Sequence, residues 1–565
     1  MNRQPTTWII KEKIPEKISD DLRKYPNLIR QILYNRGIRT LQEADDFLRA
    51  NSPEYSPHAL KDMKKAVQII YQSILDKKKI IVFGDYDVDG ITSSVILVQL
   101  LQKYRADVDV FIPNRFDEGY GLSFDAIASV REKHPDLIIT VDCGVRSAKE
   151  VKFLKDEGIS IVITDHHQPH QYIPDADAVI CPKQPSDNYP DKHLAGVGIA
   201  YKLAKGMLKA HPIDGVDAND WIDLVAVGTI ADLAPLDDEN RALVRRGLRR
   251  IRLAQNRGLL ALSNVSGTNI QQIASEDIGF RIGPRLNAAG RLDSANLAYR
   301  LLMAKTTREA GELALELDQK NRKRQIITHD IEQCALEKYD PNTHKHFLFF
   351  WDDSFHEGVV GLAASRLVEK FYRPAIVGVQ NDGIVRASCR SIEGFNIISA
   401  LDRCEEYLVQ HGGHAMAAGL SINVEQIKEF CMAFNSVCEE MITKDMLIRK
   451  LTAVAEITFR DLKPKNLSYY DLLEPLGTNN PIPLFVTRDV RIKRIKKIGK
   501  EYKHLKMTLT DGNLDFTTLA WRFGDYYDTL KRAEKLDILY AYETNTYQGS
   551  VKLQLRLVDF RISAD

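Results

Sequence analysis

Five short apolar runs in the first half of the chain restrict its fold more than any other feature. They read KIIVFGDYD, DVDVFIPN, LIITVDCG, SIVITDHH and DAVICP, and segments with a helical pattern separate them. Strands rich in Ile and Val that are buried on both faces are typical of a mostly parallel sheet covered by helices. The sequence therefore predicts an α/β domain over residues 61–295, preceded by a small helical lead-in over residues 1–60.

The pattern changes again in the second half, which makes the chain an α/β multidomain protein. Residues 296–340 lack proline and contain Gly311 as their only glycine, so we expect a long connecting helix within residues 296–345. A second α/β pattern follows over residues 346–445. Five strand-like segments with polar turns over residues 446–565 predict a small β-barrel, of which the OB-fold is the five-stranded kind that binds oligonucleotides.

Composition restricts the class of protein further. Lys and Arg number 78 against 77 Asp and Glu, which argues against an evenly basic nucleic-acid binder but allows charges that are segregated along the chain. The seven cysteines are scattered without a CxxC pair, as expected for reduced thiols in a cytosol. Neither a signal peptide nor an apolar run long enough to span a membrane is evident, so we expect a cytoplasmic protein without a membrane partner.

Acidic residues and histidines follow the predicted strands. Because ligands bind at the carboxyl ends of parallel strands, we expect these side chains to meet in one cleft. So many carboxylates would repel one another unless cations neutralise them. Single residues of this kind are often only turn formers or helix caps, but several clusters that each follow a parallel strand favour a binding site. The set comprises Asp85, Asp87, Asp89, Asp142, Asp165, His166, His167 and Asp232.

The donor types indicate which metal such a cleft would hold. Oxygen ligands with one or two histidines and no thiolate favour Mn²⁺ or Mg²⁺ over a structural zinc ion. Two such cations, roughly 3.5 to 4 Å apart, would stabilise the attacking and the leaving oxygen of a phosphoryl transfer. The sequence therefore predicts two-metal phosphoester chemistry.

The motifs that carry these residues resemble the DHH phosphoesterase family in order, residue type and spacing. They are GDYDVDG (84–90), VDCG (141–144), DHH (165–167) and GTIADLAPL (228–236). Further motifs are similar to the narrower RecJ branch, single-strand-specific 5′-to-3′ DNA exonucleases. These are PNRFDEGYGL (113–122), LAGVGIAYKL (194–203), GPRLNAAGRLD (283–293), HEGVVGLAASR (356–366), ASCRS (387–391) and GGHAMAAG (412–419).

The resemblance implies roles for the acidic cluster and a DHH-associated substrate-binding domain over residues 346–445. The implied metal ligands are Asp87, Asp89, Asp142, His166 and Asp232, and Asp85 and His167 are implied as further ligands or as groups that orient them. One position departs from the wider superfamily, where a histidine often stands two residues before Asp85. Here it is Phe83, which cannot be a ligand.

The resemblance also implies a clamp on the substrate. Ser388 and Arg390 match positions that grip the terminal 5′ phosphate, together with Arg115, and Arg285 resembles a residue that contacts the nucleotide. A planar guanidinium suits phosphate, although an isolated arginine is more often a solvated surface residue. A loop that approaches the scissile phosphate is implied for Gly412, Gly413 and His414, although a glycine pair before a histidine is more often only a turn. His356 is a candidate of the same kind, with the same plain alternative.

The barrel contains the densest basic cluster of the chain. Residues 488–506 hold nine Lys or Arg against two acids, a pattern that suits a groove for phosphates but also a solvated strand face. Two aromatic residues, Phe485 and Trp521, are expected in the core rather than as stacking platforms. The candidate DNA-binding residues are Arg491, Lys493, Arg494, Lys496, Lys497 and Tyr502.

The resemblance implies a monomeric 5′-to-3′ exonuclease that releases nucleoside 5′-monophosphates from single-stranded DNA in recombination and repair. A single-strand-binding protein and a helicase are candidate partners. One alternative is a phosphoesterase for short oligoribonucleotides, cyclic dinucleotides or pyrophosphate, although such proteins usually lack the barrel. Another is a non-catalytic DNA-binding replication factor, although such relatives have lost part of the acidic set.

Overall fold

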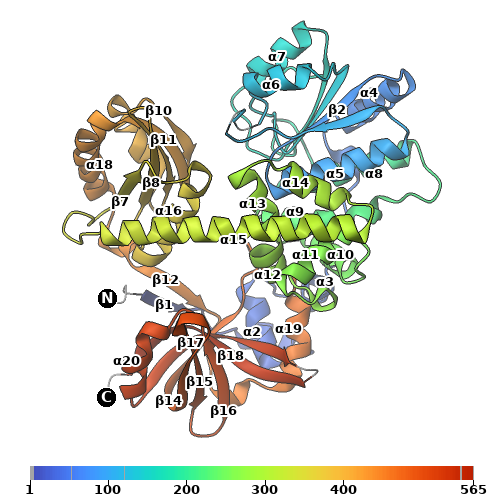
Figure 1. Ribbon diagram of the computed structural model, residues 1–565. Coiled ribbons are helices and arrows are strands. Elements are labelled where there is room, and N and C mark those ends of the chain that lie inside the picture. The colour runs from blue at the N-terminus through green and yellow to red at the C-terminus, as the bar shows by residue number, and fades with distance from the viewer. Residues whose placement is uncertain (1–5, 53, 117, 120, 548–549, 564–565) are drawn as a thin grey trace.

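The computed structural model describes residues 6–52, 54–116, 118–119, 121–547 and 550–563 of the chain. Two α/β domains lie side by side in Figure 1, and the long helix α15 (Thr307–Glu337) runs beneath both. A β-barrel lies on the other side of this helix, next to the N-terminal strand. None of the helices in these described ranges is long and apolar enough to cross a membrane.

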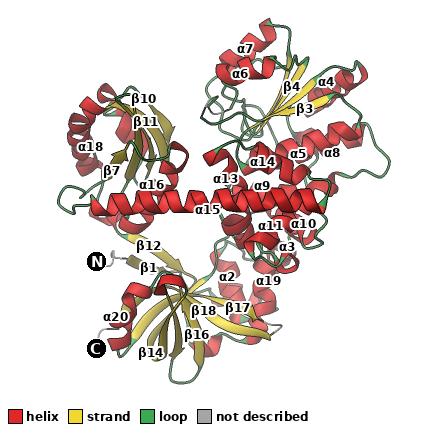
Figure 2. Cartoon of the chain, viewed as in Figure 1, coloured by secondary structure: helices red, strands yellow, loops and turns green. Residues whose placement is uncertain are grey.

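The first domain is built on a five-stranded parallel sheet in the order β3-β2-β4-β5-β6. Alternate residues of β2 (Ile80–Gly84) face two different cores, since Ile80 and Val82 belong to one and Ile81 and Phe83 to the other. Helices therefore cover both faces, as Figure 2 shows, and the predicted parallel α/β domain is confirmed. The other elements are β3 (Val108–Phe111), β4 (Leu137–Val141), β5 (Ser160–Thr164), β6 (Ala178–Ile180), α4 (Met63–Leu75), α5 (Val88–Lys103), α6 (Phe124–Arg131) and α7 (Ala148–Asp156).

A layer of helices completes this domain and leads into α15. The predicted long helix is present, and it begins only at Thr307, because Thr306 accepts a hydrogen bond from the Glu309 N–H (3.2 Å) and caps a new helix after α14 (Asn296–Met303). The remaining helices are α8 (Gly196–Ala210), α9 (Ile222–Ala231), α10 (Asp238–Ile251), α11 (Arg257–Ser266), α12 (Ser275–Asp277) and α13 (Gly283–Leu292), with a π-helical turn at Ile278–Ile282.

The second domain has a mixed five-stranded sheet in the order β10-β11-β9-β8-β7. Strands β7 and β8 are parallel, and the other neighbours are antiparallel. Its elements are β7 (Leu348–Asp352), β8 (Ala375–Asn381), β9 (Ile384–Arg390), β10 (Gln410–His414), β11 (Ala417–Asn423), α16 (Glu357–Phe371), α17 (Ile397–Asp402) and α18 (Ile427–Met441).

The C-terminal region forms the predicted closed five-stranded barrel. The sheet runs β14-β15-β16-β18-β17, and β14 pairs again with β17 to close the ring, while β13 adds at one edge. Its elements are β13 (Ala455–Glu456), β14 (Leu484–Ile498), β15 (His504–Thr510), β16 (Asp515–Ala520), β17 (Leu536–Tyr547), β18 (Ser550–Ile562), α19 (Leu467–Leu473) and α20 (Tyr527–Arg532).

The N-terminal residues pack against this barrel. Strand β1 (Thr6–Ile10) pairs in parallel with β12 (Arg449–Ala453), and Ile29 and Leu33 of α2 lie in one core with Phe485 of the barrel. An apolar helix face in the sequence signals burial but does not identify its partner, so this contact could not be predicted. The helices here are α1 (Glu16–Asp21), α2 (Asn27–Asn35) and α3 (Leu41–Arg49).

A buried arginine joins the barrel side of the molecule to the first domain. Arg241 of α10 is 1% exposed and donates hydrogen bonds to the carbonyls of Phe47, Leu472 and Leu473 at 3.1 to 3.2 Å. Burial lowers the pKa of its guanidinium to about 9, and these carbonyls accept the hydrogen bonds that the buried group requires. The barrel is therefore held in a defined position relative to α9 and α10.

Candidate metal centre and phosphate pocket

The turn from β2 into α5 places three carboxylates at the carboxyl edge of the first sheet. Asp87 caps α5, because its Oδ1 accepts hydrogen bonds from the N–H groups of Asp89 (2.9 Å) and Gly90 (3.1 Å). Asp85 is almost fully buried before it. Asp89 is buried in the first helical turn and points toward the start of α8.

The N-terminus of α8 holds Asp89 in place. The N–H of Gly196 donates to Asp89 Oδ2 (2.7 Å), and the N–H of Val197 donates to Oδ1 (2.6 Å). A helix N-terminus carries partial positive charge and free N–H donors, so it stabilises a carboxylate there. Both donors belong to the LAGVGIAYKL motif, but the sequence alone assigned them no role.

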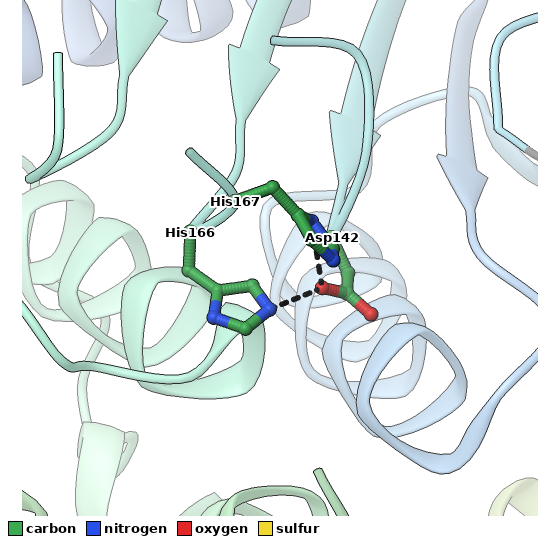
Figure 3. Close-up of side chains that lie close together, drawn as sticks. All are labelled: Asp142, His166 and His167. Carbon is green, nitrogen blue, oxygen red and sulfur yellow. Dashed lines mark ion pairs between the residues drawn. The ribbon is translucent and has the colours of Figure 1, made fainter. Parts of the chain in front are cut away.

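Asp142, His166 and Asp232 meet Asp89 at the ends of β4, β5 and α9. His166 Nε2 lies 3.1 Å from Asp142 Oδ1 and 3.9 Å from Asp89 Oδ2, and His166 Nδ1 lies 3.9 Å from Asp232 Oδ2. Figure 3 shows the imidazoles of His166 and His167 both directed at the same oxygen of the Asp142 carboxylate. The structure thus brings together the acidic and imidazole groups that the sequence predicted to converge.

Asp165 orients the histidine pair, a role that the sequence reasoning left unassigned. Its Oδ1 lies 2.7 Å from His167 Nδ1 and accepts the N–H of His166, and its Oδ2 accepts the N–H of Val145 (2.9 Å). Burial alone would raise the pKa of Asp165, but the hydrogen bond and charge of His167 outweigh burial and lower it to about 2. A carboxylate that fixes an imidazole in this way is typical beside metal sites.

The electrostatics of the cluster call for cations. Burial, followed by repulsion from neighbouring aspartates, raises the pKa of Asp85, Asp89 and Asp142 well above its ordinary value. Burial and the Asp87 charge raise the pKa of Asp232 to about 7. Burial lowers the pKa of His166 to about 3, which keeps the imidazole neutral and able to bind a metal. Only positive charge placed among these groups would make the ionised cluster stable.

The donor atoms also fit such cations geometrically. Among the described residues, Asp85 Oδ1, Asp142 Oδ1 and His166 Nε2 are buried without a hydrogen-bond partner, which is costly unless a ligand satisfies them. Three groups have ligand atoms that all lie within 4.8 Å of one another: Asp142, His166 and His167; Asp89, His166 and Asp232; and Asp85, Asp87 and Asp142. Carboxylates with few imidazoles suit Mn²⁺ or Mg²⁺.

Phe83, by contrast, belongs to the core. It is fully buried, and its ring stacks on Phe111 with centroids 5.4 Å apart. The structure agrees with the expectation that this side chain is no ligand.

A second polar site lies where the first domain faces β9 and β10. A pocket of about 360 Å³ is lined by Arg115 from the first domain and by Ser388 and Gly412 from the second. Arg386 and His411 line it as well, and the sequence reasoning named neither. Arg386 stands two residues before Ser388 on β9, so strand alternation could have placed it on the same face.

Arginines gather next to this pocket. Arg390 lies beside it, since a Cβ on Gly361 would stand 3.0 Å from Arg390 Nη2 and 3.3 Å from Ser388 Oγ. Burial, and then the charges of Arg115, Arg324 and Arg390, lower the pKa of Arg291 to about 10. In the described part of the chain, Arg390 and Arg291 donate to backbone carbonyls, of Cys389 and Gly358, rather than to carboxylates. Glu357 is the carboxylate that lines the pocket beside these arginines, so positive charge prevails there, as suits an anion.

Sequence reasoning did not single out Arg291 or Arg324. Arg291 stands in the GPRLNAAGRLD motif, where only Arg285 was selected, and Arg324 belongs to α15. In the structure Arg285 donates to Asp318 Oδ1 (2.9 Å) and to the Arg281 carbonyl (2.7 Å), so it ties α13 to α15. Its contact with a nucleotide stays a prediction.

The other residues of the second domain that were predicted to contact the substrate lie at three separate points. His356 caps α16, its Nδ1 accepting the N–H of Gly358 (3.2 Å), and its ring meets Phe116 edge-on at 5.7 Å. Gly413 has a φ of 148°, and a Cβ there would stand 2.5 Å from the Ala417 carbonyl oxygen, so the close β10–β11 hairpin requires glycine. His414 is exposed at the end of β10, outside the residues that line the pocket.

The basic residues of β14 are exposed on the barrel surface. Arg494 and Lys496 pair across the sheet with Thr508 and Lys506, and no carboxylate of the described chain forms an ion pair with either. Lys493 is partly neutralised by Asp515 at 2.8 Å. Arg491 and Lys497 are exposed as well, and Tyr502 is 67% exposed.

The two aromatic residues that we expected in the barrel core differ in how far they are buried. Phe485 is fully buried, as predicted. Trp521 is 47% exposed and meets His504 edge-on at 5.0 Å, so its predicted place in the core is wrong. Trp521 directly follows β16 in a turn, where Arg522 has a φ of 66°, and the chain there leaves the barrel wall.

Family models match three parts of the chain. The DHH family N-terminal domain matches residues 79–229, the DHHA1 domain residues 344–440 and the RecJ OB domain residues 455–559.

Similar proteins extend over nearly the whole chain. A protein of Haemophilus influenzae named single-stranded-DNA-specific exonuclease RecJ is 35% identical over 98% of this chain and 98% of its own length. The protein of the same name from Bacillus subtilis is 36% identical over 95% of this chain and 68% of its own length. The crystal structure of RecJ from Thermus thermophilus in complex with Mn²⁺ is similar over 99% of this chain and 80% of that chain, with a TM-score of 0.84 and 28% identity. A complex with Mg²⁺ from the same organism has a TM-score of 0.79, with 27% identity over 99% of this chain and 79% of that chain.

Proposed function

The chain belongs to the RecJ family, and we propose how its own residues carry out the reaction of a single-stranded-DNA-specific exonuclease. It is a metal-dependent nuclease of the DHH phosphoesterase class, and its cations are Mn²⁺ or Mg²⁺. One observation carries the assignment of residues. A buried cluster of carboxylates and imidazoles lies in the first domain, and an arginine-lined pocket joins the first domain to the second.

We propose that Asp87, Asp89, Asp142, His166 and Asp232 hold two divalent cations, with Asp85 and His167 as neighbouring ligands or orienting groups. When bound, the cations would polarise the scissile phosphodiester and offset the charge that builds up in the transition state. The chain itself keeps the ligands in position: the N-terminus of α8 holds Asp89, and Asp165 holds His167. The neutral His166 imidazole leaves Nε2 available as a ligand atom.

The phosphate pocket supports a 5′-to-3′ direction. We propose that Arg115, Ser388 and Arg390 bind the terminal 5′ phosphate, with Arg291 adding positive charge beside them. A guanidinium group can donate two parallel hydrogen bonds to two phosphate oxygens, and few carboxylates compete for the arginines of this pocket. A strand fixed by its terminal phosphate presents its first phosphodiester to the metal cluster, so a nucleoside 5′-monophosphate leaves in each round. Gly412 and Gly413 allow the β10 backbone to approach that terminal nucleotide, with His356, His414 and Arg285 as proposed secondary contacts.

The barrel supports the strand further from the site. Its exposed basic face on β14 suits the phosphates of single-stranded DNA, with Tyr502 as a candidate stacking residue. Because the barrel is fixed to the first domain through Arg241, a strand bound there would be aligned with the cleft.

One experiment tests this function against its alternatives. Single strands labelled at the 5′ or the 3′ end are incubated with Mn²⁺ or Mg²⁺ and with wild type or Asp142→Ala. Release of mononucleotides from the 5′ end by wild type, and its loss in the variant, is the expected result. Hydrolysis confined to short RNA, cyclic dinucleotides or pyrophosphate would contradict it in favour of a small-substrate phosphoesterase. Tight binding without hydrolysis would favour a non-catalytic replication factor.

We also propose the oligomeric state, the cellular compartment and the partners of the enzyme. We propose a monomer, and the seven cysteines are free thiols, which supports a reducing compartment such as the cytoplasm. We propose a role in DNA recombination and repair, with a single-strand-binding protein and a helicase supplying the unpaired strand. Co-purification from cells with each of these proteins, in the presence of nuclease to remove bridging DNA, tests the partnership.

A further inference from the structure

A short π-helical turn, Ile278–Ile282, lies between the barrel and the metal cluster. On the barrel side, Arg556 of β18 forms an ion pair with Glu276 (2.9 Å), and Ser275 donates to the Leu476 carbonyl (2.7 Å). On the other side the turn packs against the last residues of α9. Figure 1 shows α12, which leads into the turn, between the barrel and the layer of helices.

The contacts with α9 place the turn next to a proposed metal ligand. A Cβ on Gly279 would stand 3.8 Å from Ile230 Cγ2, and one on Gly283 would stand 3.5 Å from Ala231 Cβ. Asp232 follows Ala231 directly. The segment Ser275–Ile282 therefore contacts the barrel side at one end and the helix that leads to Asp232 at the other.

The turn presents an exposed aromatic ring. Phe280 is 78% exposed, the highest value among the large hydrophobic side chains of the described residues, and it stands next to Arg281. Single exposed apolar residues are common, so exposure alone carries little weight. Here the ring is held out by a π-helical turn, a rare geometry that is frequent at functional sites.

A second exposed apolar side chain lies beside the metal cluster. Leu233 follows Asp232, is 70% exposed and has a φ of 62°, a left-handed conformation that is unfavourable for leucine. Strained residues persist only where the surrounding structure holds them, and they gather at functional sites. Two exposed apolar side chains thus lie on neighbouring elements, and one of them directly follows a proposed metal ligand.

We propose that Phe280 stacks against an unpaired base of the strand between the barrel and the metal cluster. This inference rests on the proposed function and adds a substrate-positioning residue to it. Stacking on an aromatic ring tolerates every base, because each base has a π face. Arg281 next to it is half-exposed and paired at 3.5 Å with Asp277, so it adds at most part of a positive charge for the backbone. Bases inside a duplex are already stacked on their neighbours, so Phe280 favours single strands over duplexes.

Steady-state kinetics on a long single strand give the first test. For Phe280→Ala we expect KM to rise roughly tenfold while kcat changes less than about twofold, because one stacking contact is lost and the metal ligands remain. Phe280→Trp and Phe280→Tyr should keep KM close to wild type. The control is Leu75→Ala: Leu75 is 58% exposed at the end of α4, near the amino ends of the strands and opposite the metal cluster, and its loss should leave KM unchanged.

Strands with a single abasic site give the sharper test. The site is moved one nucleotide at a time from the 5′ end, and wild type should show a rise in KM at one or two positions. At those positions Phe280→Ala should show no further rise, because base and ring form the same contact. Equal abasic profiles for wild type and Phe280→Ala overturn the proposal, as does a Phe280→Ala variant with unchanged KM.

Three further measurements separate the outcomes. If wild type hydrolyses no single strand with Mn²⁺ or Mg²⁺, the proposed function fails. If wild type hydrolyses single strands normally and Phe280→Ala has the same KM as wild type, only the stacking role is overturned. Folding is checked by Tm, which an exposed side chain should barely affect. In an Asp142→Ala background, Phe280→Trp should show fluorescence quenched by an intact strand and not by a fully abasic strand. Equal quenching by both overturns stacking.

Discussion

Gly196 lies directly against the carboxylate of Asp142. A Cβ on Gly196 would stand 2.8 Å from Asp142 Oδ1 and 2.9 Å from Asp142 Cβ, closer than such atoms approach in proteins. The same residue donates its N–H to Asp89. One glycine at the start of α8 therefore sets the position of two proposed metal ligands.

Gly196→Ala should displace Asp142 and weaken metal binding. We expect the Mn²⁺ concentration for half-maximal activity to rise about 10- to 100-fold, the usual effect of disturbing groups that position metal ligands. Activity as a function of Mn²⁺ concentration measures it. Gly311→Ala is the control: apart from the chain neighbours and the backbone of its own helix, no atom lies within 4 Å of a Cβ there, so activity should stay at the wild-type level while Tm stays equal or rises. An unchanged Mn²⁺ dependence in Gly196→Ala would show that Asp142 can move without loss.

Arg390→Ala should abolish the preference for a 5′ phosphate. Wild type is expected to prefer 5′-phosphorylated over 5′-hydroxyl strands, and the variant should lose about 10- to 100-fold in kcat/KM on phosphorylated strands and little on hydroxyl strands. Competition between the two substrates measures the ratio. Arg308→Ala, whose side chain is 90% exposed on α15, is the matched loss of an arginine. Equal losses on both substrates would remove Arg390 from the phosphate pocket.

The basic face of β14 should control the salt dependence of binding. Changing Lys493, Arg494, Lys496 and Lys497 together to Ala should lower the slope of log affinity against log salt by about 2 to 3, since each phosphate contact contributes about 0.7 for single strands. Binding of long strands in an Asp142→Ala background measures the slope, and hydrolysis of very short strands should be largely kept. Lys493→Ala alone should have little effect, because Lys493 is already paired with Asp515. An unchanged slope in the fourfold variant would assign these residues to solvent.

Asp223 should make stability depend on pH. It is 5% exposed at the start of α9, and burial raises the pKa of its carboxyl group from 3.8 to about 6. Below about pH 4 the group is protonated in the folded and the unfolded chain. As pH rises from about 4 to 6 the unfolded chain ionises first, so wild type loses up to about 3 kcal/mol of stability.

Asp223→Asn removes that titration. The free energy of unfolding of the variant minus that of wild type should increase by up to about 3 kcal/mol between about pH 4 and pH 7 and then level off. Urea unfolding at several pH values measures the difference. A difference that does not vary with pH would mean that Asp223 keeps an ordinary pKa in the folded chain.

The sequence predicted the parts of this molecule that depend on local pattern. Carboxylates placed directly after buried strands meet at one edge of a parallel sheet, so Asp142 and His166 could be brought together by reasoning from strand order alone. Asp232 stands at the end of a helix, so strand order does not place it in the cluster, and the family motifs supported its inclusion.

The parts that it missed depend on contacts between distant segments. Arg291 and Arg324 lie on different helices, and nothing in the local sequence indicates that their charges meet near Arg390. Trp521 was assigned to the core on residue type, yet it stands in a turn where the chain leaves the barrel. Phe280 lies just before a recognised motif, but its exposure follows from a π-helical turn that no periodicity indicates.

The packing of the N-terminal helices on the barrel sets an order of events during protein synthesis. Asn35 donates a hydrogen bond to the carbonyl of Val454, a partner 419 residues further along the chain. On the ribosome, the apolar face of α2 must therefore remain without its final partner while both α/β domains are translated and fold. Delayed translation or a shortage of chaperones should therefore impair the packing of α2 on the barrel first, while the catalytic domain still folds.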